Sequence, residues 1–238
     1  MGRAHEVRAA SMAKTAAAKS KLYSIYAKEI YQAAKTGGTS PDANPALKRL
    51  IEKAKKEQVP NDVINRSIDK VNKGSGEDYT TVEYEAFGPN GSTMIIKCLT
   101  DNTNRTLTYV RTAMTKTGAK MAGQGAVSYM YDYLCAVGFP FDNEDEVLEV
   151  MIENDIDVKD IENEDGIITI YAEPSELFKI KNALESKYGE IKYEIDEIGK
   201  FAKETVTLTG EDLAKFEKIK NAIEEVDDVQ NIWHNVSL

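Results

Sequence analysis

The spacing of the apolar residues changes abruptly at Gly74-Ser75-Gly76. Upstream of this point, apolar side chains recur every three or four residues, which is the spacing of one helix face. Downstream they alternate with polar residues, as in strands that have one buried side. Glycine and serine at the transition favour a flexible joint. We therefore predict an all-α domain over residues 1–76, followed by sheet-containing domains.

Three helices are predicted in the all-α domain. The first carries an apolar stripe and ends at two glycines, Gly37-Gly38, with the stripe made of Leu22, Tyr26, Ile30 and Ala33. The second begins after an N-cap at Asn44 with proline in its first turn, and the third opens on Pro60. This pattern indicates a small three-helix core.

The order of elements after the joint predicts two α+β domains. Residues 81–99 read as two strands around a Gly-Pro-Asn-Gly turn, and a helix follows over about residues 103–118. Within residues 133–199 the pattern is βαββαβ, with strands at 133–139, 158–161, 167–172 and 191–195 and helices at 144–154 and 174–188. This unit is complete in itself, so the later strand, helix and strand need other partners.

The fold class that follows is α+β and multidomain: an N-terminal all-α three-helix domain, then two α+β ferredoxin-like domains, one inserted into the other. The predicted boundaries are 1–76 for the basic all-α domain, 77–132 plus 200–238 for a split α+β domain, and 133–199 for the inserted domain.

Charge is distributed unevenly between these parts. Residues 1–74 carry 15 Lys and Arg against 7 Asp and Glu, whereas residues 75–238 carry 15 against 33. A basic module joined to acidic ones indicates an anionic partner for the module alone. Ordinary solubilising lysines would be the other explanation of such a run.

Four lysines recur every seven positions, at Lys14, Lys21, Lys28 and Lys35. On a helix this repeat drifts by only about 20° per step, so the four form one stripe. Lys19 falls on the opposite, apolar side, and residues 9–19 offer only Met12 as a sizeable apolar group. We expect this segment to fray and to become ordered against an anionic surface.

The loop at residues 101–106 offers more polar groups than one helix cap requires. Asn102, Asn104 and Arg105 stand at the start of a predicted helix, where phosphate binds readily. A capping network and a contact site are both consistent with this sequence. The candidate nucleic-acid-binding residues are therefore Arg3, His5, Arg8, Lys14, Lys19, Lys21, Lys28, Lys35, Asn102, Asn104 and Arg105.

Catalytic and metal-binding patterns are missing from the sequence. Only His5 and His234 carry imidazoles, and no metalloprotease, phosphate-loop, dinucleotide or nucleophile-elbow motif occurs. Cys98 and Cys135 match no metal spacing and are interpreted as buried thiols in a reducing compartment. We expect no enzyme activity, no cofactor and no metal. With neither a membrane-spanning stretch nor a signal peptide in the sequence, we expect a cytoplasmic protein.

Several stretches together resemble the YebC/PmpR family, which is related to the mitochondrial translational activator of cytochrome oxidase subunit one. Besides the basic opening, the matching stretches are GGTSPDANPAL (37–47), VPNDVINRSI (59–68), FGPNG (87–91), CLTDNTNRT (98–106) and GAVSYMY (125–131). Residues 2–24 lack the Gly-His-Ser-Lys-Trp opening of most members and are typical of the second branch. The family's usual opening begins here at residue 2, which argues against a transit peptide.

The resemblance implies three domains and a nucleic-acid partner. Members are described as DNA-binding transcriptional regulators, and members are also linked to translation through proline-rich sequences. Lysine suits the phosphate backbone more than base edges, and neither a recognition helix nor a symmetric dimer is evident. We therefore expect a monomeric translation factor that binds ribosomal or transfer RNA, with promoter DNA as the alternative target. In the translational interpretation, Arg3, His5, Arg8 and Lys14 reach towards the transfer RNA acceptor end.

Overall fold

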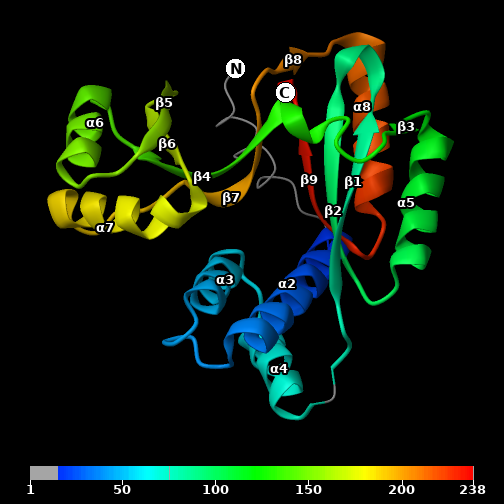
Figure 1. Cartoon of the computed structure of the whole chain (residues 1–238), viewed down its shortest axis with the longest axis horizontal. Coiled ribbons are helices and arrows are strands. Elements are labelled where there is room, and N and C mark those ends of the chain that lie inside the picture. The colour runs from blue at the N-terminus through cyan, green and yellow to red at the C-terminus, as the bar shows by residue number, and fades with distance from the viewer. Residues whose placement is uncertain (1–15, 75, 238) are drawn as a thin grey trace.

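The structure is a computed structural model that describes residues 16–74 and 76–237. Its architecture is α+β, with a helical module followed by two four-stranded sheets (Figure 1). In Figure 1 the helical module lies beneath the two sheet-containing parts, with helices covering one sheet on the right and the other on the left. The predicted fold class is confirmed.

The helical module consists of α2 (Ala16–Gly37), α3 (Pro45–Lys56) and α4 (Asn61–Asn72). The predicted stripe of α2 packs into its core, where Ile30 and Leu47 are fully buried. Asn44 caps α3 by accepting from Leu47 N at 3.1 Å, and its amide donates to Ala33 O at 2.9 Å. One side chain therefore joins the end of α2 to the start of α3. Residues 16–19 are helical, although fraying was predicted there, and residues 9–15 lie outside the described part.

The first sheet has the strand order β3-β1-β2-β9. Its strands are β1 (Thr80–Phe87), β2 (Thr93–Thr100), β3 (Lys120–Met121) and β9 (Val229–His234), and α5 (Thr103–Thr117) and α8 (Gly210–Glu224) pack against it. Asn90 and Gly91 take φ values of 48° and 79°, which confirms the predicted turn between β1 and β2. Two short strands, β8 (Val206–Thr207) and β10 (Val236–Ser237), pair in parallel nearby.

The second sheet has the order β5-β6-β4-β7, which is the ferredoxin-like arrangement. Its strands are β4 (Tyr131–Pro140), β5 (Val158–Glu164), β6 (Ile167–Ala172) and β7 (Ile195–Ala202), and its helices are α6 (Glu144–Glu153) and α7 (Leu177–Tyr188). All of them lie in the chain between β2 and β9, which are hydrogen-bonded neighbours in the other sheet.

The last strand of this sheet was predicted at residues 191–195, and that position is wrong. β7 begins at Ile195 and pairs with β4 from Gly138 back to Tyr131. Tyr193 belongs to the apolar core, and its carbonyl accepts from Lys56, so an apolar residue in a connecting segment resembled a strand residue. The strand consequently continues into residues that had been assigned to the other domain.

Side-chain burial agrees with the interpretation of the two cysteines as buried thiols. Cys98 and Cys135 are both free and buried, and burial raises the pKa of the Cys98 thiol to about 12. Across residues 16–74 and 76–237, no helix is long and apolar enough to cross a membrane. The same residues contain no cluster of His, Cys, Asp and Glu that could hold a metal ion.

Candidate nucleic-acid interface

The lysine stripe of α2 faces the first sheet. Lys21 Nζ donates to Val226 O at 2.9 Å, Lys28 Nζ lies 2.9 Å from Asp228 Oδ1, and Lys35 pairs with Asp78. In this conformation, acceptors of the acidic part of the chain hold these lysines. Part of the positive charge of the helical module is therefore balanced inside the molecule, and phosphate binding by the stripe stays a prediction.

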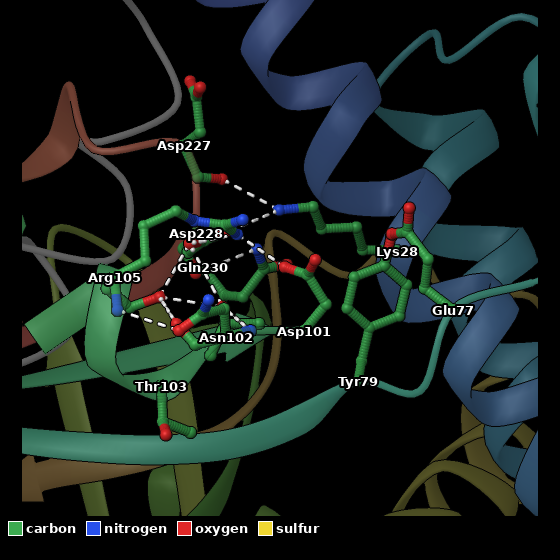
Figure 2. A network of polar contacts seen from close by, with 12 residues as sticks. Lys28, Glu77, Tyr79, Asp101, Asn102, Thr103, Arg105, Asp227, Asp228 and Gln230 are labelled. Atoms are coloured by element: carbon green, nitrogen blue, oxygen red, sulfur yellow. Dashed lines mark hydrogen bonds and ion pairs between the residues drawn. The ribbon is translucent and has the colours of Figure 1, made fainter.

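Asp228 is the centre of a polar network between α2, β2 and α5 (Figure 2). Its carboxylate accepts from Thr106 Oγ1 at 2.7 Å and Thr100 Oγ1 at 3.2 Å, and the Arg105 guanidinium lies at 3.3 Å. Burial alone would raise the pKa of Asp228, but hydrogen bonds from Lys28 and Thr106 outweigh it and lower that pKa. The residue is only 4% exposed, so its negative charge depends on these donors.

The loop at residues 101–106 is part of the same network. Asn102 caps α5 by accepting from Arg105 N at 3.0 Å, and the Arg105 side chain pairs with Asp101 at 2.5 Å. Asn104 is exposed on the first turn. Asn102 and Arg105 thus have structural partners, which favours the capping interpretation of this loop over the phosphate-contact one, whereas Asn104 remains accessible.

α3 contacts the second sheet through its own cations. Arg49 Nη2 donates to Asp196 O at 3.0 Å, Lys53 Nζ lies 2.5 Å from Glu197 Oε2, and Lys56 reaches a backbone carbonyl of the same segment. Burial opposes ionisation of Asp196, but the Lys181 and Arg49 charges lower its pKa overall. The helical module is therefore held to both sheets by contacts of basic side chains with carboxylates and carbonyls.

Further exposed cations of the helical module lie on α3 and α4. Arg66, Lys70 and Lys73 are exposed and spaced i, i+4 and i+7, which places them within an arc of about 60° on α4 and its C-cap. Lys48 and Lys55 are exposed at an i, i+7 spacing on α3. Arg66 also pairs with Asp62 one turn earlier. We call these five residues the outer basic face.

α4 also presents amides, but on a different side of the helix, centred about 130° around the axis from Arg66, Lys70 and Lys73. Asn61, Asn65 and Asn72 are exposed and fall within about 40° of one another on the helix. Asparagine forms paired hydrogen bonds with adenine in the major groove, and lysine and arginine bind phosphates. One helix therefore offers both groups that a nucleic-acid reader uses.

The remaining predicted residues are placed as follows. Lys19 is exposed on α2. Arg3, His5, Arg8 and Lys14 lie outside the described residues. Sequence reasoning missed the outer basic face because it followed the seven-residue lysine repeat of α2. The i, i+4, i+7 spacing of Arg66, Lys70 and Lys73 was the signal that could have identified it.

Together these features define a class: a three-part α+β protein with a basic helical module docked on two acidic sheet domains. Comparisons with known proteins give the family. The model of the TACO1/YebC protein N-terminal domain matches residues 3–74, and that of the TACO1/YebC second and third domain matches residues 79–236. The chain belongs to the TACO1/YebC family.

Full-length relatives carry regulatory names. A probable transcriptional regulatory protein of Pseudoalteromonas atlantica is 51% identical over 235 residues, covering 99% of this chain and 97% of the relative. One of Alcanivorax borkumensis is 48% identical over 238 residues, covering 100% of both. The crystal structure of a conserved hypothetical protein from Aquifex aeolicus superposes with a TM-score of 0.77 at 34% identity, covering 94% of this chain and 92% of that one.

Proposed function

We propose that this chain is a nucleic-acid-binding regulatory protein that contacts DNA through the outer basic face, with the exposed asparagines of α4 as further candidate contacts. The observation that carries the proposal is the division of the cations: the inner ones are held by protein acceptors, whereas Lys48, Lys55, Arg66, Lys70 and Lys73 are exposed. The names of the relatives agree with transcriptional regulation. They do not identify a target sequence.

A second candidate is a translation factor that binds ribosomal or transfer RNA and supports elongation through proline-rich sequences. Four of the five residues in the outer basic face are lysines, which suit the irregular phosphate surface of folded RNA. In this candidate, the opening residues Arg3, His5, Arg8 and Lys14 add contacts near the reacting ends.

A binding measurement tests the shared part of both candidates. Labelled duplex DNA and a labelled RNA hairpin are titrated with the full chain and with the Arg66→Ala, Lys70→Ala, Lys73→Ala triple variant. Each lost phosphate contact should reduce the slope of log K against log salt by about 0.7 to 0.9. Lys179→Ala, at an exposed lysine of α7 in the second sheet domain, is the control. An unchanged slope in the triple variant contradicts the proposed interface.

Localisation in cells separates the two candidates. A cell lysate is sedimented through a sucrose gradient, and promoter occupancy is measured in parallel by crosslinking. Recovery with nucleoid DNA and selective occupancy of promoters support the DNA candidate. Comigration with the large ribosomal subunit, together with rescue of a consecutive-proline reporter, supports the translational one.

A further inference from the structure

A pocket of about 180 Å³ lies between α2 and β9, on the inner side of the helical module. Apolar side chains from both elements line it, chiefly Leu22 and Ile25 of α2 and Ile232 of β9. A depression of this volume has room for several waters or for one planar heterocycle in their place. The pocket is too small for a drug-sized ligand.

Gln230 lines this pocket and is only 7% exposed. Its Nε2 makes a long contact of 3.4 Å with Asp228 O, and within the described part of the chain its Oε1 has no hydrogen-bond partner. Leaving a buried carbonyl oxygen without a donor costs about 1–3 kcal/mol. Because this oxygen is itself buried, a ligand that brings an N–H group into the pocket would recover that energy only once the Gln230 side chain turns towards it.

The backbone of β9 is irregular at this residue. Lys97 pairs with Asn231 and Cys98 pairs with Val229, so Gln230 is the extra residue of a β-bulge. Bulges redirect a side chain away from the regular alternation of the strand and are frequent beside functional sites. The bulge and the unpartnered oxygen are independent observations that concern the same residue.

The pocket carries one cation and one carboxylate, Lys21 and Glu224, so a phosphate would have to approach on the Lys21 side. Lys21 lines the pocket and uses one N–H on Val226 O, whereas a lysine ammonium has three donors. Asn231, which is exposed, adds a second amide beside Gln230. Apolar walls, an acceptor inside and a cation at the pocket match the ring, amino group and phosphate of a nucleotide.

We propose that this pocket holds one unpaired nucleobase of the bound nucleic acid, which donates an N–H to Gln230 Oε1 while its phosphate approaches Lys21. The inference rests on the proposed nucleic-acid function and adds to it a contact with a single-stranded or extruded base. The outer basic face then supplies phosphate affinity, and the pocket supplies selection for a base.

The test compares a short labelled single-stranded oligonucleotide with the same oligonucleotide lacking its bases. The full chain should prefer the base-bearing strand by roughly three- to tenfold, the value of one hydrogen bond. Gln230→Met keeps the length of the side chain but removes the acceptor, so it should abolish that preference while the salt slope stays unchanged. Gln124→Met, at an exposed glutamine, is the matched control. The melting temperature of Gln230→Met should be equal or higher, because an unpartnered polar atom is removed.

If Gln230→Met prefers the base-bearing strand over the base-free strand as strongly as the parent does, the pocket inference is wrong. The proposed outer basic face would still stand in that case. A base preference that depends on Gln230, combined with a salt slope unaffected by the α4 triple variant, supports the pocket and overturns the proposed face instead. Methyl resonances of Ile25 and Ile232 locate the base: they should shift with the base-bearing strand and not with inorganic phosphate. If they do not move with either, the pocket is not the site.

Discussion

Lys28 Nζ lies 2.9 Å from Asp228 Oδ1, although the two residues are 200 positions apart in the sequence. The pair joins the helical module to the segment that precedes β9, and the two side chains are 17% and 6% exposed. The same lysine donates to Asp227 O at 3.2 Å and lies over the ring of Tyr79. This helix-to-sheet contact is therefore built around a nearly buried charge.

Asp228→Ala should lower the free energy of unfolding by about 3 kcal/mol, because it removes the carboxylate that pairs with Lys28 and accepts from two threonine hydroxyls. Asp227→Ala is the matched control, since that exposed residue accepts from Lys28 through its backbone carbonyl, which the substitution keeps; it should change stability by less than about 0.5 kcal/mol. Urea titrations of both variants check this. Equal stabilities would mean that the Asp228 network does not contribute to folding.

Because His234 is partly buried, we expect the protein to lose stability in weak acid. Burial, with Lys220 nearby, lowers its pKa from 6.5 to about 4, so between these values the unfolded chain binds a proton that the folded chain does not. Neutral His234 adds roughly 3 kcal/mol to the free energy of unfolding above pH 6.5. This contribution decreases as the pH falls towards 4.

His234→Phe removes this titration and preserves a ring beside Phe216, whose ring centroid lies 5.1 Å away. Its stability should depend less on pH between 6.5 and 4 than that of the parent, as measured by urea midpoints at several pH values. His5→Gln, at the second histidine of the chain, should retain the parental profile. A steep parental profile in His234→Phe would assign the effect to other groups.

The close contact of Gly199 with Trp233 leaves no room for a larger side chain where the two sheets meet. A Cβ atom there would lie 2.6 Å from Nε1 of Trp233, so β7 and β9 approach each other through a residue with no side chain. Gly199→Ala should cost about 1–3 kcal/mol by displacing the indole. Gly123→Ala, where an added Cβ meets nothing within 4 Å, is the control. Thermal melts and tryptophan fluorescence, which Trp233 alone supplies, report both effects.

Residues 77–238 expressed alone should fold cooperatively, because all strands of both sheets lie within that span. The fragment should lose the affinity supplied by the outer basic face, and Asp228 should lose its lysine partner. Calorimetry and the DNA and RNA titrations test the two expectations separately. Tight binding by the fragment would place the interface on the sheets.

Local chemistry made much of the fold predictable. Asn44 and Pro45 marked the start of α3, the turn at Asn90-Gly91 marked the β1–β2 hairpin, and the βαββαβ pattern indicated a ferredoxin-like sheet. These signals act within a few residues, so the sequence displays them directly. The predicted position of β7 was wrong because the burial of Tyr193 in the core depends on contacts outside its own segment.

The candidate site was less predictable for a physical reason. The seven-residue lysine repeat was recognised, but a helical wheel shows which residues share a face and not what that face contacts. Lys21 and Lys28 meet acceptors from residues 226–228, which no local pattern pairs with α2. The bulge at Gln230 likewise depends on the register with β2.

The pairing of β2 with β9 also has a consequence for synthesis on the ribosome. Every strand of the β4–β7 sheet emerges before residues 229–234, so that sheet can close while the β1–β2 hairpin still exposes the edge that β9 will cover. We therefore expect the β4–β7 sheet to close before the β1–β2–β9 sheet that flanks it in the chain. An unpaired edge invites aggregation, so a chaperone that shields β2 during translation should raise the yield more than one that binds the finished protein.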